Sequence, residues 1–194
     1  MLSLNFSPFP IIETERLLLR CLTMDDAATF FSLRTNEKVI EHFNRAPDES
    51  PEATKAKMEE ILQMQEKNEG ILWVIAFKHK PAEMIGNIGY WRMTKEHYRA
   101  EIGYLLSPDH WKKGIMKEAL NAVVDYAFTT MKLHSIEANI NPDNIASGAL
   151  LESCGFIKEA YHKENYYYNG VFYDSIIYSK LNNIKPSKRD DIFS

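Results

Sequence analysis

The sequence predicts an α+β protein with a mixed, mostly antiparallel sheet of about seven strands and about four helices. Three observations support this fold class. Three apolar runs over residues 71–109 are separated by turn-sized gaps, which is typical of antiparallel strands. A long apolar stripe at helical spacing follows Gly114 and leads into a further strand. Near the end, Asn169 and Gly170 form the dipeptide that most strongly indicates a tight hairpin turn.

The predicted elements alternate between strands and helices along the chain. In order, they are a strand over residues 16–22, helices over 23–36 and 50–68, strands over 71–78, 81–93 and 98–109, a helix over 114–131, a strand over 133–141, a helix over 144–156 and a hairpin over 156–181. Several helix ends carry capping residues, namely Thr23, Ser50 before Pro51, Asn144 and Gly155. Residues 102–140 predict one strand–helix–strand crossover between parallel strands.

A cluster of lysines stands where this crossover helix begins. Lys112, Lys113 and Lys117 surround Gly114, although the whole chain has a net charge of -4. In α/β sheets, phosphate groups bind where a strand ends and a helix begins, because unpaired backbone N–H groups and the helix dipole both point at the anion. The cluster therefore predicts a local anion site, with a solvated helix start as the alternative.

Composition predicts one globular domain over residues 1–181 and a polar tail over 182–194. The longest apolar run is too short to span a bilayer and the N-terminus has no basic signal region, so we expect a soluble, cytoplasmic protein with no membrane partner. The acidic balance argues against a nucleic-acid partner. The two cysteines, Cys21 and Cys154, and the histidines show no metal-ligand spacing, which predicts a reduced compartment and no metal.

The order of elements and four local motifs together resemble the GNAT superfamily of acetyl-CoA-dependent N-acetyltransferases over residues 11–181. The motifs read IIETERLLLRCLTMDDA, AEIGYLL, WKKGIMKEAL and LHSIEANINPDNIASGALLESCGFIKEA. They are similar more narrowly to the branch that includes the ribosomal-protein N-terminal (alanine/serine) acetyltransferases. The resemblance implies a GNAT fold, acetyl-CoA as co-substrate, and direct attack by a primary amine in a ternary complex. The acceptor stays open between a protein N-terminal α-amine and a small amine such as a polyamine or an antibiotic.

The lysine cluster falls on the family's Gln/Arg-x-x-Gly-x-Gly/Ala motif, whose backbone amides wrap the pyrophosphate of coenzyme A. The resemblance therefore implies a coenzyme A contact for each of Lys112, Lys113, Gly114, Ile115, Met116 and Lys117. Trp111 and Met116 depart from the family pattern. The larger Met116 could narrow the approach to the phosphates, although any side chain retains the backbone N–H.

The resemblance also implies how the pantetheine arm binds. The strand that ends at Leu106 would separate from the strand IEANIN, and pantetheine would insert between them like an added strand. Backbone groups of Leu105, Leu106 and Ser107 would pair with the pantetheine amides, and one N–H would polarise the thioester carbonyl. Asn144 would hydrogen-bond the pantetheine or thiol region.

Three residues are candidates for catalysis. Glu101 matches the glutamate that serves as general base in the histone acetyltransferase branch, and the alternative for it is a solvent-facing charge. Glu164 on the hairpin is the competing base. Ser147 stands where the ribosomal-protein branch has a serine near the sulfur, while Leu151 occupies the position of the tyrosine acid of many members.

The hairpin aromatics either shape the acceptor pocket or, as we favour, pack across the strands; they are Tyr166, Tyr167, Tyr168, Phe172 and Tyr173. The alternative function is a non-catalytic acetyl-CoA-binding sensor module. The departures at Trp111, Met116 and Leu151 favour the sensor, whereas the presence of Glu101 favours an enzyme. The sequence leaves a homo-oligomer open.

Overall fold

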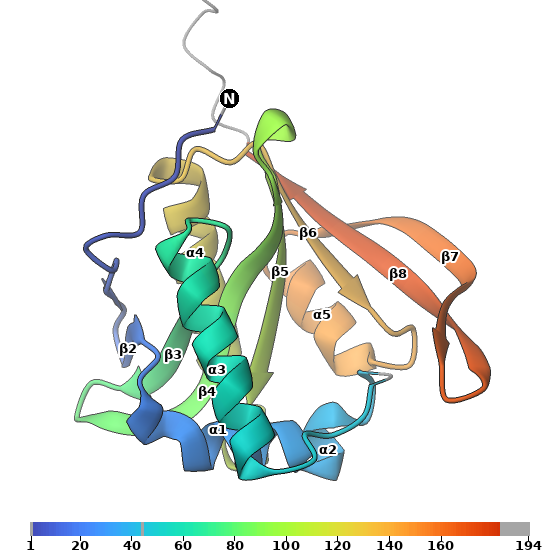
Figure 1. Cartoon of the computed structure of the whole chain (residues 1–194). Helices are drawn as coiled ribbons and strands as arrows, with labels where there is room; N and C mark the ends of the chain where they lie inside the picture. Colours follow the sequence, from blue (N-terminus) through green and yellow to red (C-terminus); the bar gives the residue numbers. More distant parts are fainter. Residues whose placement is uncertain (1, 44, 183–194) are drawn as a thin grey trace, which may run out of the picture.

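A mixed eight-stranded sheet forms the centre of the structure, a computed structural model that describes residues 2–43 and 45–182 (Figure 1). The strands are β1 Ile12–Glu13, β2 Leu17–Cys21, β3 Ile71–Phe77, β4 Lys80–Thr94, β5 Arg99–Leu106, β6 Ser135–Ile140, β7 Ile157–Tyr168 and β8 Val171–Leu181. Their order is β1-β2-β3-β4-β5-β6-β8-β7, and within the described residues only β5 and β6 pair in parallel. The sequence predicts every strand except β1, which is too short to carry a pattern.

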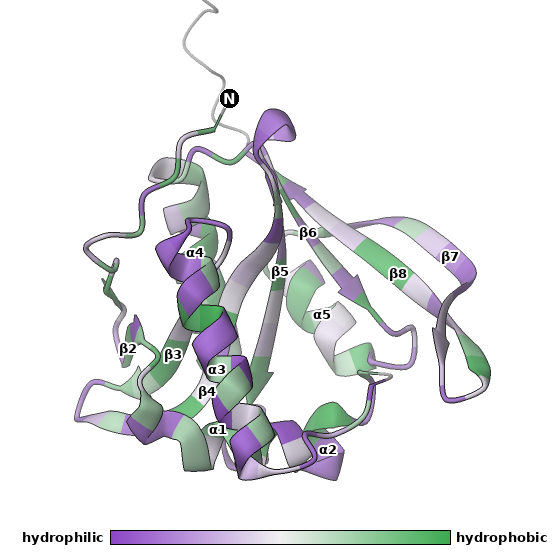
Figure 2. Ribbon diagram, in the orientation of Figure 1, coloured by the Kyte–Doolittle hydropathy of each residue, from purple (hydrophilic) through white to green (hydrophobic). Residues whose placement is uncertain are grey.

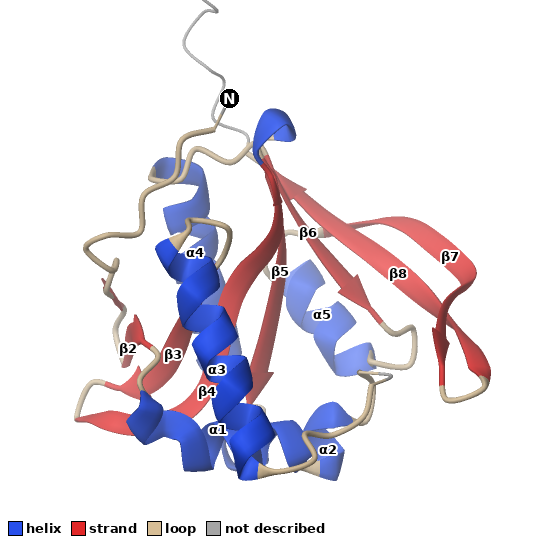
Figure 3. Cartoon of the chain, in the orientation of Figure 1, coloured by secondary structure: helices blue, strands red, loops and turns tan. Residues whose placement is uncertain are grey.

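Helices cover both faces of this sheet, with α3 on one side and α4 on the other (Figure 3). Their bounds are α1 Ala27–Thr35, α2 Glu37–Ile40, α3 Pro51–Glu66, α4 Ile115–Thr129 and α5 Ile145–Ser153. Short 3-10 turns occupy Met24–Asp26, Lys95–His97 and Pro108–His110. The four longer helices confirm the sequence prediction. The single-turn α2 was not predicted, because four residues are too few for an apolar period; Asn36 caps it by accepting from the N–H of Lys38.

The strand β3 is buried along nearly its whole length because both faces of the sheet are covered. Ile71, Trp73 and Ile75 pack in the core under α4, while Leu72 and Val74 pack in the smaller core under α1 and α3. The continuous apolar run ILWVIAF therefore belongs to a two-sided strand. By contrast, α3 lies on the outside and its outer face is polar, seen as purple segments in Figure 2.

Side-chain caps explain where two of the helices begin. The Ser50 hydroxyl accepts the N–H of Ala53 at 3.1 Å, and the Asn144 side-chain oxygen accepts the N–H of Ser147 at 3.0 Å. At the hairpin turn Asn169 and Gly170 have positive φ angles of 48° and 83°, as a two-residue turn that follows the sheet twist requires. These features confirm the predicted boundaries.

The segment after Thr23 differs in one respect from the predicted helix. It opens with the 3-10 turn, and α1 begins only at Ala27. The Asp26 side chain is 3% exposed and forms an ion pair of 2.6 Å with Arg20, while also accepting the N–H of Thr23 at 2.9 Å. Asp26 is therefore a buried structural ion rather than an exposed charge at a helix start.

The last described residue is Asn182, one residue into the predicted tail. Its backbone N–H donates to the carbonyl of His134 at 2.8 Å, and its side chain donates to the carbonyls of Leu133 and Phe128 at 3.0 and 3.4 Å. Asn182 thus belongs with the domain. The rest of the predicted tail, residues 183–194, lies outside the described residues.

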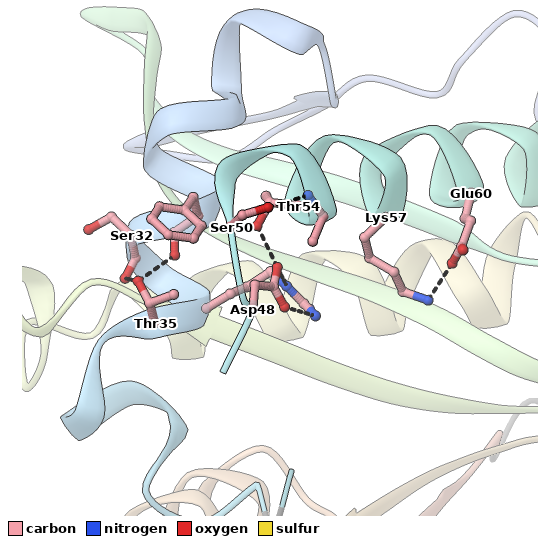
Figure 4. Close-up of polar contacts among 10 residues, drawn as sticks. Ser32, Thr35, Asp48, Ser50, Thr54, Lys57 and Glu60 are labelled. Carbon is pink, nitrogen blue, oxygen red and sulfur yellow. Dashed lines mark hydrogen bonds and ion pairs between the residues drawn. The ribbon is translucent and has the colours of Figure 1, made fainter. Parts of the chain in front are cut away.

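An ion pair fixes the loop that joins α2 to α3. Both carboxylate oxygens of Asp48 accept from the Arg34 guanidinium, at 2.6 and 2.7 Å, and Thr54 donates to the same carboxylate at 2.6 Å. Figure 4 shows Thr54 of α3 pointing at Asp48. Burial alone would raise the pKa of Asp48, but the hydrogen bonds from Arg34 and Thr54 outweigh it and lower this pKa. The loop is therefore held against both α1 and α3.

We expect Asp48→Asn to lower the free energy of unfolding by about 2–3 kcal/mol at pH 7, because it leaves a half-buried guanidinium without its partner. Since the pKa of Asp48 is lowered in the folded state, the stabilisation is present above the unfolded value of 3.8 and is lost as the pH falls through the folded value. Urea unfolding of wild type and variant at several pH values measures this difference.

The control is Glu60→Gln, which removes the exposed ion pair between Lys57 and Glu60 on α3, also drawn in Figure 4. Because exposed pairs contribute little, its stability should follow that of wild type at every pH. A gap for Asp48→Asn that stays constant down to pH 2 would contradict the electrostatic origin.

Candidate active site

The parallel pairing between β5 and β6 stops after three residues. Residues 99–101 pair with residues 135–137, and beyond Glu101 the two strands diverge (Figure 1). Each strand remains paired on its other edge, β5 with β4 as far as Leu106 and β6 with β8 as far as Ile140. A cavity of about 810 Å³ opens where they part. The separation of these two strands confirms what the family resemblance implies.

The hydrogen bonds of β5 decide which of its backbone groups face this opening. The Ser107 N–H donates to the carbonyl of Ile85 at 2.9 Å, and hydrogen-bonded pairs alternate along antiparallel strands. Leu105 therefore also directs its backbone groups toward β4, whereas Tyr104 and Leu106 direct theirs toward the opening. The structure thus differs from the prediction at Leu105, whose groups face β4, and at Ser107, whose N–H bonds to β4 while its carbonyl accepts the N–H of His110 at 2.9 Å. It adds Tyr104.

Trp111, a departure from the family motif, supports the turn after β5. Its indole N–H donates to the carbonyl of Leu106 at 2.8 Å. In the same turn the Lys113 ammonium donates to the carbonyl of Asp109 at 2.7 Å. The turn is therefore tied to the strand end by its own side chains.

The loop before α4 has the geometry of an anion site. Gly114 has a φ of 74°, in the left-handed region that favours glycine, and among the described residues no side chain caps the first turn of α4. The N–H groups of that turn are thus available to a ligand. Met116 does not obstruct the loop, because its side chain is buried in the core with Ile115. The predicted narrowing at Met116 is therefore absent.

Arg16 is a cation at this loop that the sequence prediction missed. Its guanidinium donates to the carbonyl of Lys113 at 3.1 Å and pairs with Glu118 at 2.7 Å, and Glu118 also accepts from the Thr14 hydroxyl at 2.5 Å. Burial alone would raise the pKa of Glu118, but the bonds from Thr14 and Arg16 outweigh it and lower this pKa. No local pattern could reveal Arg16, since it lies in the bend before β2, far from Gly114 in the sequence.

The three predicted lysines, Lys112, Lys113 and Lys117, are exposed around Gly114. Exposed ammonium groups on flexible stems act as mobile charges toward an anion rather than as fixed ligands. Lys113 is held by its bond to Asp109, so the mobile charges are Lys112 and Lys117, and the fixed elements of the loop are its backbone, Lys113 and Arg16.

Glu101 lies at the last paired residue of β5 and lines the cavity. Its carboxylate accepts from the Arg92 guanidinium at 2.9 Å, and its side chain is 19% exposed. The Trp91 ring covers Gly103, two residues along the strand, so closely that any β-carbon there would lie 2.3 Å from it. Glycine at this position lets the indole form the wall beside Glu101.

Ser147 in the first turn of α5 meets a residue that sequence reasoning did not single out. Its hydroxyl lies 2.7 Å from the Tyr104 hydroxyl, and both residues line the cavity. Burial raises the pKa of Tyr104 to about 12, an effect that the hydrogen bond with Ser147 only partly offsets. Asn144 caps this helix and also lines the cavity, whereas Leu151 is fully buried in the core.

The hairpin contributes a different carboxylate from the one predicted. Glu164 is exposed and does not line the cavity, while Asp174 does. Asp174 accepts from the Tyr161 hydroxyl and from the N–H of Glu164, at 2.7 Å for the latter, and these bonds lower its pKa. The pairing of β7 with β8 is irregular between His162 and Tyr166, so the sequence could not reveal which acid faces inward.

Both interpretations of the hairpin aromatics hold, for different residues. Tyr167 and Phe172 pack across the strands with their ring centres 4.9 Å apart. Tyr166 instead lines the cavity. The other two, Tyr168 and Tyr173, are not among the lining residues.

Two features are absent from the part of the chain that the structure describes. No helix there combines the length and apolar character needed to cross a bilayer. No group of three or more His, Cys, Asp or Glu residues is placed to hold a metal ion.

A strand that parts from its parallel neighbour, beside a glycine loop that opens a helix, is the arrangement of a GNAT acetyltransferase. The family model described as "Acetyltransferase (GNAT) domain" matches residues 16–157, and the chain belongs to this family of acetyl-CoA-dependent N-acetyltransferases.

Three relatives illustrate the range of similarity. YoaA of Bacillus subtilis, an uncharacterised N-acetyltransferase, is 37% identical over 151 residues, which is 78% of this chain and 85% of YoaA. The [ribosomal protein uS5]-alanine N-acetyltransferase of Escherichia coli is 29% identical over 78% of this chain and 80% of its own. The structure of spermidine N-acetyltransferase from Vibrio cholerae with CoA and spermine has a TM-score of 0.77 at 25% identity, covering 87% and 97% of the two chains.

We expect Gly114→Asp to weaken coenzyme A binding tenfold or more, about 1.4 kcal/mol, because it places a carboxylate against the anion site. The matched control is Gly114→Asn, which has the same shape, tolerates the left-handed backbone equally and carries no charge. A β-carbon at this position meets only Arg16, at an ordinary contact distance of 3.5 Å, so both variants should fold. Calorimetry with coenzyme A measures the difference, and equal affinities of the two variants would contradict a phosphate role for this loop.

Proposed function

We propose that this acetyltransferase transfers the acetyl group of acetyl-CoA directly to a primary amine in a ternary complex, with Glu101 accepting the amine proton. One observation carries the proposal: Glu101 stands on β5 where its pairing with β6 ends, so the carboxylate and the opening for pantetheine belong to one strand. The acceptor is the α-amine of a protein N-terminus or a small amine, the two kinds of acceptor named for relatives.

In this proposal the co-substrate binds along the end of β5 and the start of α4. The N–H groups of Ile115, Met116 and Lys117 and the surrounding lysines hold the pyrophosphate. Backbone groups of Tyr104 and the N–H of Leu106 pair with the pantetheine amides, in the manner of an added strand, while the Leu106 carbonyl stays bonded to Trp111. An N–H from the same stretch polarises the thioester carbonyl.

The acceptor amine must lose a proton before or during attack, because its lone pair forms the new bond. An α-amine has a pKa of about 7.7–8.0 and a lysine amine of about 10.4, so both are largely protonated at neutral pH. Glu101 accepts this proton, directly or through one water molecule. Arg92 holds the carboxylate in place through the 2.9 Å bond.

The departing thiolate accepts a hydrogen bond from the hydroxyl of Ser147, which in turn accepts one from Tyr104, and the thiolate takes its proton from solvent. The 2.7 Å contact between the two hydroxyls supports this chain of hydrogen bonds. The raised pKa of Tyr104, about 12, keeps its hydroxyl protonated as a donor. Since an alkyl thiol has a pKa of about 8.5, the thiolate can leave as an anion stabilised by these hydrogen bonds, without proton transfer from Tyr104.

The alternative function, a non-catalytic acetyl-CoA sensor, was favoured by three departures from the family pattern. The structure gives two of them a structural explanation. Trp111 has a structural role in the turn, and Met116 is buried away from the loop. The third departure, Leu151 at the position of the family's tyrosine, remains. The hydroxyls of Tyr104 and Ser147 offer hydrogen-bond donors to the thiolate in place of that tyrosine.

We expect Glu101→Gln to lower kcat by about 10²- to 10⁴-fold at pH 7 while coenzyme A binding is retained. The loss should shrink as the pH rises above the amine pKa, because the neutral amine no longer needs a base. Thiol release from acetyl-CoA, measured from pH 6 to pH 10 with a panel of amines and N-terminal peptides, checks both statements.

Glu137→Gln is the matched control, because Glu137 lies opposite Glu101 on β6 but does not line the cavity. It should retain wild-type kcat. A deficit of Glu101→Gln that is flat with pH would indicate an electrostatic role instead of a base. If Asp174→Asn or Glu164→Gln loses activity while Glu101→Gln does not, the base is on the hairpin. Stabilisation by acetyl-CoA without thiol release from any amine would indicate the sensor.

A further inference from the structure

We propose that the acceptor is an amine that also carries a carboxylate, and that Arg45 binds this carboxylate. The inference rests on the proposed function and specifies its substrate class. An α-amino acid and a peptide N-terminus followed by an acidic side chain both have this chemistry. A polyamine, which carries only positive charges, does not.

Arg45 is a guanidinium without an anionic partner inside the cavity. It lies in the loop between α2 and α3, is half-buried and lines the cavity. Its guanidinium carbon sits 5.1 Å from the centre of the Phe43 ring, and none of its N–H groups donates to a described residue. Burial and the nearby Arg34 lower its pKa, while Asp48 and Tyr166 act in the opposite direction. A fork of N–H donors held in this way suits a carboxylate, which it can bind through two oxygens.

The neighbouring cations in the cavity wall are already paired. Arg34 is bound to Asp48, Lys57 to Glu60 and Arg92 to Glu101. An incoming carboxylate would share each of these cations with the carboxylate that already neutralises it, whereas Arg45 has no such partner among the described residues. The Arg34 pair also fixes the loop that carries Arg45, so the guanidinium is held in position before a ligand arrives.

A buried amide on the face of the sheet under α1 and α3 indicates a ligand with hydrogen-bond acceptors. Asn87 of β4 is 5% exposed and lines the cavity, and its Nδ2 is buried without a hydrogen-bond partner in the described residues. It lies beside Val74 and Leu105, which pack under α1 and α3. Glu101 is on this face too, because it lies four residues from Leu105 on β5 and alternate residues of a strand share a face. A carbonyl or carboxylate oxygen would satisfy the buried amide.

Two of the three carboxylates that line the cavity, Glu60 and Glu101, are paired with cations. The third, Asp174, accepts from two neutral donors, the Tyr161 hydroxyl and the N–H of Glu164, and keeps its negative charge. A polyamine would compete with cations at Glu60 and Glu101 and would meet Arg45 without a counter-charge. The cavity thus favours an acceptor with one positive and one negative group, with the amine toward Glu101 and the carboxylate toward Arg45.

The test compares acceptors that differ only in the carboxylate. Alanine with alaninamide represents the free amino acid, Ala-Glu with Ala-Gln represents the peptide N-terminus, and spermidine represents the polyamine. For at least one pair, wild type should acetylate the acid with a kcat/KM about tenfold or more above that of the amide. Arg45→Met should lower this acid-to-amide ratio about tenfold, through KM rather than kcat. Because the readout is a change of ratio between two proteins, differences in amine pKa cancel.

Two further variants sharpen the result. Arg45→Lys keeps the charge but loses the fork, so its ratio should fall between those of wild type and Arg45→Met. Lys57→Met removes another cation of the cavity wall and should leave the ratio unchanged. Thermal unfolding of each variant verifies that it is folded.

Equal acid-to-amide ratios in wild type and Arg45→Met, or a higher kcat/KM for spermidine than for every acid, would overturn the inference. Failure of the proposed function is distinguishable, because it means no thiol release with any acceptor. In that case calorimetry measures the binding of the same acid and amide compounds to the coenzyme A-saturated protein, for wild type and Arg45→Met. Binding of the acid that depends on Arg45 supports the inference, and absence of such binding overturns it.

Discussion

The end of the parallel pairing between β5 and β6 is the constraint on which the rest of the site depends. A sheet that stayed paired beyond Glu101 would use the backbone groups of Tyr104 and Leu106 internally and leave no edge for an extended ligand. Both strands keep their other neighbours, so the opening costs pairing at one seam only. The crossover helix α4 begins at the same end of β5. One local interruption therefore brings an unpaired strand edge and a helix N-terminus together.

The positive charges near the α4 loop differ in mobility from those on the other side of the opening. Near the α4 loop Lys112 and Lys117 are exposed and mobile, while Lys113 donates to the carbonyl of Asp109 and Glu118 fixes Arg16 against the loop backbone. On the other side the lysine and arginine side chains that line the cavity are paired, except Arg45, which alone among these described cations forms no ion pair or hydrogen bond. Mobile charge suits a flexible polyanion, while a fixed guanidinium suits a small group that must be oriented for reaction.

Sequence patterns could predict what local physics determines. The apolar run of β3, the stripe of α4, the caps Ser50 and Asn144 and the turn at Asn169 each depend on residues near one another in the chain, and each is confirmed. Contacts between distant segments could not be predicted. The bond between Tyr104 and Ser147 and the approach of Arg16 to Gly114 depend on strand register and packing, which no local pattern encodes. Asp174 replaces Glu164 at the cavity for the same reason, since the irregular pairing of β7 shifts which side chains face inward.

The two halves of the site differ in how they are built, and this difference bears on specificity. The half assigned to coenzyme A consists of backbone groups on β5 and α4, which many sequences can supply without changing shape. The half assigned to the acceptor consists of side chains from the α2–α3 loop, β4 and the hairpin, held by ion pairs such as Arg34 with Asp48. A single substitution there changes the charge that an acceptor meets while the sheet stays intact. Relatives that share the fold can therefore take spermidine or a ribosomal-protein N-terminus, and the identity of the acceptor must be sought in loop residues such as Arg45 rather than in the fold.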